Sequence, residues 1–185
     1  MRRLHFGCGP NKLPEPWENF DREVNIARQL PFESDCAAFI FAEHVIEHVP
    51  FLDGMGFLTA CLRVLQPGGV LRFAFPDIER VLQDNSTAHQ YLLFLASQRR
   101  SAYRAHEPIS NAYRGDVARF VFLGSGHRAA WTAPIAQAAA LAVGFSSVVP
   151  SYYCDSKHRE LKGIDGHHKT SPVAELETTV IEATK

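Results

Sequence analysis

The chain has 185 residues, of which 46% are hydrophobic and 21% charged, and its formal net charge at pH 7 is -1. This composition predicts one soluble globular domain with a sizeable core, and the balanced charge excludes a general attraction to nucleic acid or to an anionic membrane. There is no apolar run of roughly 18 residues, and the start, Met1-Arg2-Arg3-Leu4, has no leader-like apolar region, so we expect a cytoplasmic protein without membrane attachment. The four cysteines contain no C-x-x-C pair, which favours free thiols.

A short apolar strand runs into a glycine turn at the beginning of the chain. Leu4-His5-Phe6 is followed by Gly7-Cys8-Gly9, and a second strand, Trp17 to Phe20, ends at Asp21. The glycines let the backbone approach a ligand closely, and an acid at the end of the second strand can accept hydrogen bonds from ribose hydroxyls. The pattern predicts a nucleoside cofactor site, although a plain strand-to-turn interpretation would also explain the glycines alone.

The segment between the two strands argues against a dinucleotide. A G-x-G-x-x-G fingerprint needs a third glycine at the opening of a helix, whereas Lys12 occupies that position and residues 10–16 contain three prolines. No helix N-terminus is therefore expected there to bind a pyrophosphate. S-adenosylmethionine, which carries adenosine but no phosphate, fits this loop better than NAD or FAD.

The following elements alternate between strand and helix. Residues 37–42 predict an apolar strand that runs into Glu43-His44-Val45-Ile46-Glu47-His48, and a helix follows from about Phe51. A strand at 70–75, a helix from Thr132 to Ala142 that Gly144 stops, and strands at 145–149 and 176–183 complete the pattern. This alternation predicts a mostly parallel sheet that is covered on both faces.

These segments resemble the class I S-adenosylmethionine-dependent methyltransferases, specifically the small type 11 branch. The matching residues are Gly7-Cys8-Gly9, Asp21, Leu30-Pro31-Phe32, Glu47-His48 and Leu65-Gln66-Pro67-Gly68-Gly69-Val70-Leu71. The resemblance covers about residues 1–80 well and the rest more loosely. It implies an α/β, Rossmann-like doubly wound fold, with a mostly parallel seven-stranded sheet and an antiparallel C-terminal edge strand. In that order residues 37–42 are the fourth strand and 70–75 the fifth, while the third is not evident.

The resemblance also implies the residues that bind the cofactor. Asp21 would hold the ribose, and the glycine turn would pass beneath the methionine part. Asn25 or Ile26 stands where relatives place an acid against the adenine, so a neutral and weaker contact is expected there. The cofactor-binding residues that it implies are Gly7, Cys8, Gly9, Asp21, Asn25, Ile26, Ala42 and Glu43.

Catalysis of methyl transfer asks little of side chains beyond holding the acceptor in line with the methyl group. A hydroxyl acceptor would benefit from a base, and His44 is the first candidate as the catalytic residue, with His127 and Asp77 behind it. An ordinary loop histidine is the competing interpretation of His44.

The segment His44-Val45-Ile46-Glu47-His48 also matches the H-x-x-E-H pattern of one class of zinc metalloprotease. That site needs both histidines on one face of a regular helix, but His44 falls at a strand-to-helix junction and Pro50 follows closely. We therefore predict no metal site, and interpret Glu47-His48 as a structural pair at the start of a helix.

Residues 80–130 are predicted to form a helical insertion that caps the substrate site. Residues 99–128 carry six arginines against two acids, which indicates either a solvated basic helical face or contacts to a carboxylate or phosphate of an anionic substrate. These arginines are Arg99, Arg100, Arg104, Arg114, Arg119 and Arg128. Because the chain starts almost at its first strand, the cover is expected from this insertion or from a second subunit in a homodimer.

The sequence thus predicts a single methyltransferase domain over residues 1–185 that uses S-adenosylmethionine and acts on a small molecule, at oxygen rather than nitrogen. The preference for oxygen comes from Glu43-His44-Val45-Ile46, which stands where amine-methylating relatives carry Asp/Asn-Pro-Pro-Tyr, and it also speaks against a nucleic-acid substrate. A module that binds S-adenosylmethionine without turnover is the alternative, and a zinc metalloprotease is a remote one.

Overall fold

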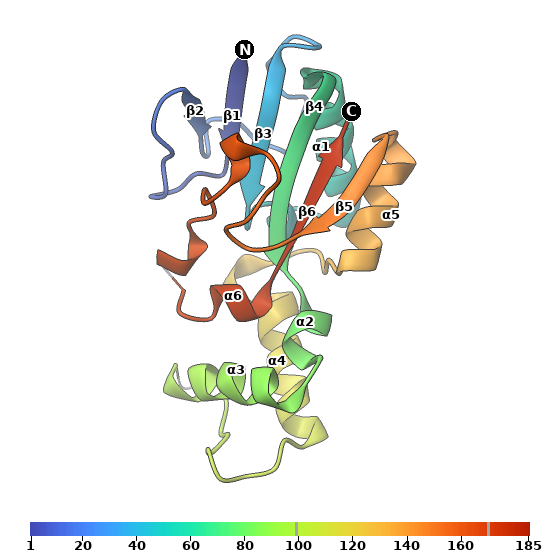
Figure 1. The fold of residues 1–185 in the computed structure, drawn as a ribbon. Coiled ribbons are helices and arrows are strands. Elements are labelled where there is room, and N and C mark those ends of the chain that lie inside the picture. The colour runs from blue at the N-terminus through green and yellow to red at the C-terminus, as the bar shows by residue number, and fades with distance from the viewer. Residues whose placement is uncertain (99, 170) are drawn as a thin grey trace.

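A six-stranded sheet forms the larger part of the molecule, in the order β2-β1-β3-β4-β6-β5 (Figure 1). The computed structural model describes residues 1–98, 100–169 and 171–185. Strands β1 to β4 pair in parallel, whereas β6 is antiparallel to both β4 and β5. The strands are β1 (Arg2–Phe6), β2 (Trp17–Phe20), β3 (Ala37–Glu43), β4 (Leu65–Pro76), β5 (Ser147–Ser151) and β6 (Thr178–Thr184).

The sheet confirms the predicted Rossmann-like α/β class, with six strands where seven were expected. The C-terminal strand is antiparallel as predicted, but it lies inside the sheet between β4 and β5 rather than at the edge. Five of the seven residues of β6 are buried, and they point to both faces of the sheet, which suits an interior strand. The edge belongs to β5, which is largely exposed and contains Pro150, a residue that an edge strand tolerates.

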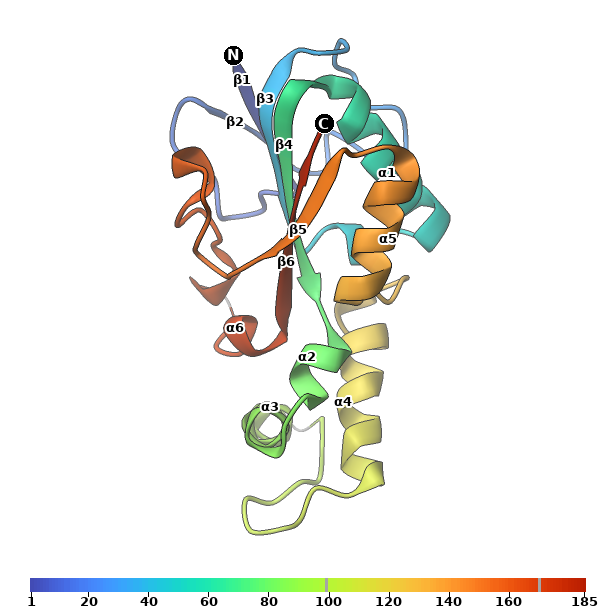
Figure 2. The ribbon, with the colours of Figure 1, turned by 45° about the vertical axis from the view of Figure 1, so that its right-hand side comes forward.

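Among the described elements, the long helices that pack along the sheet lie on one of its faces. Helices α1 (Phe51–Val64) and α5 (Ala133–Val143) pack there over the aromatic core, while the opposite face is covered by irregular chain (Figure 2). On that second face, Leu161 from the connection between β5 and β6 packs against Phe41 and Val70. The second helical layer of the doubly wound prediction is therefore replaced by turns, consistent with the prolines of residues 10–16.

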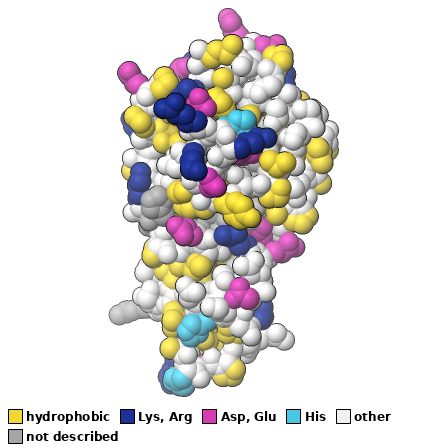
Figure 3. Space-filling model, viewed as in Figure 1, with side chains coloured by type: hydrophobic (Ala, Val, Ile, Leu, Met, Phe, Trp, Pro, Cys, Tyr) yellow, Lys and Arg dark blue, Asp and Glu magenta, His cyan; other side chains and the backbone are white. Residues whose placement is uncertain are grey.

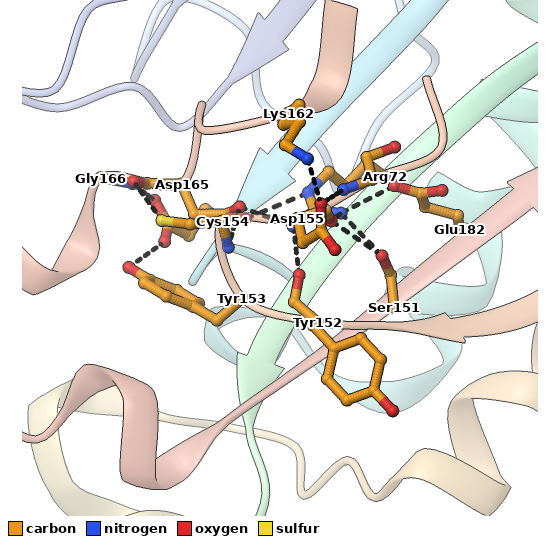
Figure 4. A network of polar contacts seen from close by, with 12 residues as sticks. Arg72, Ser151, Tyr152, Tyr153, Cys154, Asp155, Lys162, Asp165, Gly166 and Glu182 are labelled. Atoms are coloured by element: carbon orange, nitrogen blue, oxygen red, sulfur yellow. Dashed lines mark hydrogen bonds and ion pairs between the residues drawn. The ribbon is translucent and has the colours of Figure 1, made fainter. Parts of the chain in front are cut away.

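A buried ion-pair network fastens that connection to the sheet (Figure 4). The fully buried guanidinium of Arg72, in β4, donates two hydrogen bonds to Asp165 (3.1 and 2.6 Å) and one to Glu182 of β6 (2.7 Å). It also donates to the carbonyl oxygens of Tyr152 (2.9 Å) and Asp155 (3.0 Å). One side chain thus fastens Tyr152, Asp155 and Asp165 of this connection to the sheet.

Three helices form a separate lobe below the sheet (Figures 1 and 2). They are α2 (Ile78–Leu82), α3 (Asn85–Ser97) and α4 (Asn111–Leu123), and they share an apolar cluster of their own that includes Tyr91 and Val117. Asp77 joins this lobe to the sheet, because its carboxylate accepts hydrogen bonds from the Glu79 amide, the Ala133 amide and the Thr179 hydroxyl, each at 2.9 Å. Asp77, a candidate base in the sequence, is therefore buried in a structural role.

Charged side chains of both signs are mixed over the face seen in Figure 3, without a basic or acidic patch, in keeping with the net charge of -1. The connection between β5 and β6 ends in a short helix, α6 (Ala174–Glu177), which leads directly into β6. Among the helices of the described chain, none combines the length and the apolar character that crossing a bilayer requires.

Candidate functional site

The glycine turn lies at the carboxyl end of β1, where its backbone adopts the left-handed region. Gly7 has φ +68° and Gly9 has φ +45°. A Cβ placed on Gly7 would lie 2.2 Å from Cγ2 of Val45, whereas a Cβ on Gly9 would meet nothing within 4 Å. Gly7 is therefore needed for the close approach of the two loops that follow β1 and β3, and Gly9 leaves open space beside the turn.

One cavity at this edge, which we call the Asp21 cavity, brings together several of the residues that the sequence singled out. Its volume is about 570 Å³, and the predicted residues in its wall are Gly7, Asp21, Asn25, Ile26 and His44. Apolar side chains of Val24, Val45 and Val49 complete much of the lining. A cavity of this size is typical of small-molecule sites.

Within this cavity the polar and apolar contributions come from different residues. The Asp21 side chain is exposed at the end of β2, while Ile26 is 7% exposed and packs with the core. The Asn25 side-chain oxygen accepts a hydrogen bond from the Ala27 amide at 2.9 Å, so one of its two lone pairs is already used. Burial raises the pKa of the Cys8 thiol and the Asp21 carboxylate raises it further, which keeps Cys8 neutral.

A second cavity, which we call the Glu47 cavity, adjoins the first and shares Gly7, His44 and His48 with it. Its volume is about 580 Å³. The predicted residues Cys8, Gly9 and Glu43 line it, together with side chains from the helical lobe. The lobe residues are Phe94, Ser97, Gln98 and Phe120. The two cavities lie side by side at the carboxyl end of the parallel strands, where ligands bind in open α/β sheets.

His44 lies at the junction of the two cavities with φ +52°, an uncommon conformation for a residue other than glycine. Its Nε2 forms a hydrogen bond of 2.9 Å with the Thr178 hydroxyl, and its Nδ1 lies 3.3 Å from Oε1 of Glu47. The imidazole stacks on His167 with 3.8 Å between ring centroids. Burial lowers the pKa of His44 to about 4, so the ring is neutral at physiological pH.

Glu43 and Ala42, two of the predicted cofactor-binding residues, lie at the end of β3, where Glu43 lines the Glu47 cavity. The Glu43 carboxylate accepts hydrogen bonds from the Tyr153 hydroxyl (2.9 Å) and the Gly166 amide (2.8 Å), so it holds the connection between β5 and β6 against the end of β3. Ala42 is 2% exposed and lies in the core, one residue behind the cavity wall. The strand end is thus a fixed support of the site.

Glu47 is a buried acid beside several histidines. Its carboxylate is 1% exposed, and neither oxygen has a hydrogen-bond partner among the described residues. Two groups of side chains have ligand atoms within 4.8 Å of one another and could hold a metal ion: Glu47, His48 and His127, and His44, His167 and Glu177. The two histidines of the H-x-x-E-H pattern therefore belong to different groups, and the short 3-10 turn Ile46–His48 replaces the regular helix that a metalloprotease needs.

None of the described arginines of residues 100–128 lines either cavity. Arg114 donates to Asn85 at 3.1 Å, and Arg100 covers the Phe120 ring at 4.7 Å. Arg100 and Arg119 line a different cavity on the outside of the lobe, and the predicted Arg99 lies outside the described residues. The site provides no support for an arginine contact to an anionic substrate.

His167 and Glu177 belong to the wall of the Glu47 cavity but were not predicted. Both come from the long connection after β5. Its sequence has no hydrophobic periodicity, so it gave no signal that the connection reaches the ends of the parallel strands. Glu177 accepts a hydrogen bond from Tyr91 of the lobe, and burial raises its pKa to about 7.

Comparisons with known proteins agree with this architecture. Residues 11–73 match the model of a methyltransferase domain, a stretch that starts after the glycine turn and includes Asp21 and Glu47. No curated protein matches the chain.

Solved structures of S-adenosylmethionine-dependent methyltransferases are similar over the whole chain. One from Thermotoga maritima, a possible histamine N-methyltransferase, has a TM-score of 0.56 at 16% identity and is covered over 82% of its length. One from Archaeoglobus fulgidus has a TM-score of 0.55 at 13% identity, with 86% covered. One from Mesorhizobium loti has a TM-score of 0.52 at 13% identity, with 90% covered. Each covers 100% of this chain, and at these identities the likeness concerns the fold.

Proposed function

We propose that this chain is a class I S-adenosylmethionine-dependent methyltransferase that moves the cofactor's methyl group to a hydroxyl of a small molecule bound in the Glu47 cavity. The observation that carries this proposal is that Asp21, Ile26 and Gly7 line one cavity, and that a second cavity adjoins it with Gly7, His44 and His48 in both walls. A donor and an acceptor can therefore meet at one residue.

The Asp21 cavity suits adenosine in shape and chemistry. We propose that the exposed Asp21 carboxylate accepts the ribose hydroxyls, and that Ile26 and Val24 contact the adenine ring. Asn25 keeps one lone pair for the adenine amine. The open side of Gly9 leaves room for the methionine part beside Cys8.

S-adenosylmethionine, when bound, supplies a methyl group that is already activated by its sulfonium sulfur. The protein then has to orient the acceptor and exclude water, and cavity walls from the helical lobe serve both purposes. We propose that residues 78–128 act as the cap of the single domain, so cover of the site does not require a homodimer partner.

His44 is our candidate for the residue that receives the acceptor proton. With Nε2 bonded to Thr178, the remaining nitrogen is Nδ1, which faces the Glu47 carboxylate at 3.3 Å. A pKa of about 4 makes His44 a weak base. Such a base suffices only late in the reaction, when the oxygen has begun to bond the methyl group and its own proton has become acidic.

A small hydroxyl compound is the acceptor class that the site favours. Residues of the lobe line the Glu47 cavity, and the net charge of -1 gives no general attraction to a nucleic-acid backbone. The sequence after β3 lacks the motif by which related enzymes hold an amine. The free cysteines suit a reducing cytoplasm, where we propose that the enzyme acts.

Calorimetry with S-adenosylmethionine and its demethylated product tests the cofactor site. We expect Asp21→Ala to weaken the binding of both ligands by about 10-fold or more, because charged hydrogen bonds to the ribose contribute about 1.5–3 kcal/mol. Glu33→Ala, which removes another exposed acid, is the matched control and should bind as the native chain does. No binding by the native chain would overturn the proposal.

A screen of hydroxyl and amine compounds with a methyl-labelled cofactor tests the reaction. Labelled ethers or esters are the expected products, and His44→Asn should lower kcat by about 100-fold. Labelled amines would overturn the preference for oxygen. Tight cofactor binding without any product would favour the binding module over the enzyme.

A further inference from the structure

A group of three potential ligands lies in the wall of the Glu47 cavity. Glu47, His48 and His127 place their ligand atoms within 4.8 Å of one another. The ring centroids of His48 and His127 are 5.0 Å apart, and the two rings are nearly perpendicular, with 77° between their planes. Rings in this arrangement can direct one nitrogen each toward a common point, as two imidazoles do around a tetrahedral ion.

The backbone holds these residues together although they come from distant parts of the chain. The Glu47 carbonyl oxygen accepts hydrogen bonds from the amides of Arg128 (2.7 Å) and Ala129 (3.1 Å). These bonds dock the segment after α4 against the turn that carries Glu47 and His48. The position of His127 opposite His48 is therefore built into the fold.

The hydrogen bond of His127 prepares its ring for a metal. Its Nδ1 lies 2.6 Å from the Val121 carbonyl oxygen, which can only accept, so Nδ1 carries the proton. Nε2 of the neutral ring then keeps its lone pair. Donation from the second nitrogen to a backbone carbonyl is the usual outer contact of a metal-bound histidine.

Glu47 provides an independent indication of a bound cation. It is 1% exposed, and both oxygens lack hydrogen-bond donors among the described residues. Burial of a carboxylate without partners is costly, and such groups are normally paired or bound to a metal. His44 Nδ1 lies 3.3 Å and His48 Nε2 lies 4.0 Å from Oε1, so two imidazoles face this oxygen.

We infer that Glu47, His48 and His127 bind one divalent transition-metal ion, such as Zn²⁺, Mn²⁺ or Co²⁺. Two imidazoles and one carboxylate suit these ions, whereas Mg²⁺ and Ca²⁺ prefer oxygen ligands. His48 is 41% exposed on its side chain, so the ion faces the cavity and keeps open positions for an outside ligand. The second group is less suitable, because His44 and His167 stack face to face and their in-plane lone pairs do not converge.

The site has a chemical role that rests on the proposed function. An acceptor oxygen bound to the ion would lose its proton more readily, because a divalent cation stabilises the developing alkoxide. The class of acceptor that this favours is a hydroxyl compound with a neighbouring oxygen, which can occupy two open positions of the same ion.

Titration of the metal-free full chain with Co²⁺ tests the inference without any turnover. We expect one equivalent to bind, with visible d–d absorption and a rise in Tm that follows ligand concentration. Glu47→Gln and His127→Asn should each weaken Co²⁺ binding by about 100-fold or more, since the loss of a contact to a metal ligand alone lowers metal affinity by about 10–100-fold. His106→Asn, which removes an exposed histidine in the lobe, is the control and should bind as the native chain does.

Parallel calorimetry with S-adenosylmethionine separates this inference from the proposed function. Cofactor binding without Co²⁺, Zn²⁺ or Mn²⁺ binding by the native chain would overturn the metal site alone. Metal binding that survives Glu47→Gln and His127→Asn would also overturn it, provided that thermal unfolding shows the variants folded. Should His127→Asn not fold, Glu47→Gln, which keeps the side-chain shape, decides the question.

Discussion

The close contact between Gly7 and Val45 gives a prediction that links the glycine turn to the Asp21 cavity. Gly7→Ala introduces a methyl group 2.2 Å from Cγ2 and 3.2 Å from Cγ1 of Val45, far inside the roughly 3.5 Å at which carbon atoms rest. Gly9→Ala introduces the same methyl group two residues later, also at positive φ, but into open space. The two variants therefore share backbone strain and differ in the clash.

The expected magnitudes follow from these two contributions. A left-handed alanine costs about 1–2 kcal/mol, and both variants should lose this much stability. The overpacking at Val45 should cost Gly7→Ala about 1–3 kcal/mol more. Because Val45 also lines the Asp21 cavity, its displacement should weaken S-adenosylmethionine binding in Gly7→Ala but much less in Gly9→Ala.

Urea unfolding followed by the fluorescence of the buried Trp17 and Trp131 measures the stability, and calorimetry measures the cofactor affinity. Val45→Ala in the Gly7→Ala background removes both Cγ atoms and leaves the Val45 Cβ at 3.3 Å, so it should recover most of the additional loss. Equal destabilisation of the two glycine variants, or a double variant whose free energies simply add, would refute this reasoning.

Two further predictions concern buried charges. Arg72→Met should lower the free energy of unfolding by about 3–5 kcal/mol in urea, because it leaves Asp165 and Glu182 buried without their cation; a loss under 1 kcal/mol would contradict the role of the network. Glu177 has its pKa raised from 4.5 to about 7, so its contribution to stability is complete below pH 4.5 and is lost as the pH rises through about 7. Glu177→Gln should remove this pH dependence. In urea unfolding at a series of pH values, the free energy of unfolding of the variant minus that of the native chain should therefore rise by about 3 kcal/mol as the pH increases from 4.5 to about 7. A constant difference between the two proteins would refute it.

Local patterns were enough to predict much of the sheet. Helix α5, for instance, begins near Pro134 and ends at Gly144, as the helix signals indicated, and β3 and β4 lie within one or two residues of the apolar runs. The start of β4 is the exception, since it extends back to Leu65. Apolar runs and turn residues act over a few positions, so a single sequence reveals them.

The acceptor side of the site could not be predicted in the same way. Arg72 lies within an apolar strand, and only the arrival of Asp165 and Glu182 from later segments explains why a charge can be buried there. His127 and Glu47 come together through backbone hydrogen bonds between distant loops. Such pairings depend on the path of the chain in space and leave no periodic signal.

The two cavities take their walls from different parts of the chain, and this difference has a consequence for substrate specificity. The Asp21 cavity is built from segments between β1 and α1, where the family motifs lie, and its contacts suit a cofactor that many relatives share. The Glu47 cavity takes much of its wall from the lobe and from the connection after β5, which Glu43 and Arg72 fasten to the sheet. Because these walls have no counterpart in the motifs, exchanging residues such as Phe94 or Gln98 should change which acceptor binds while leaving cofactor affinity unaltered.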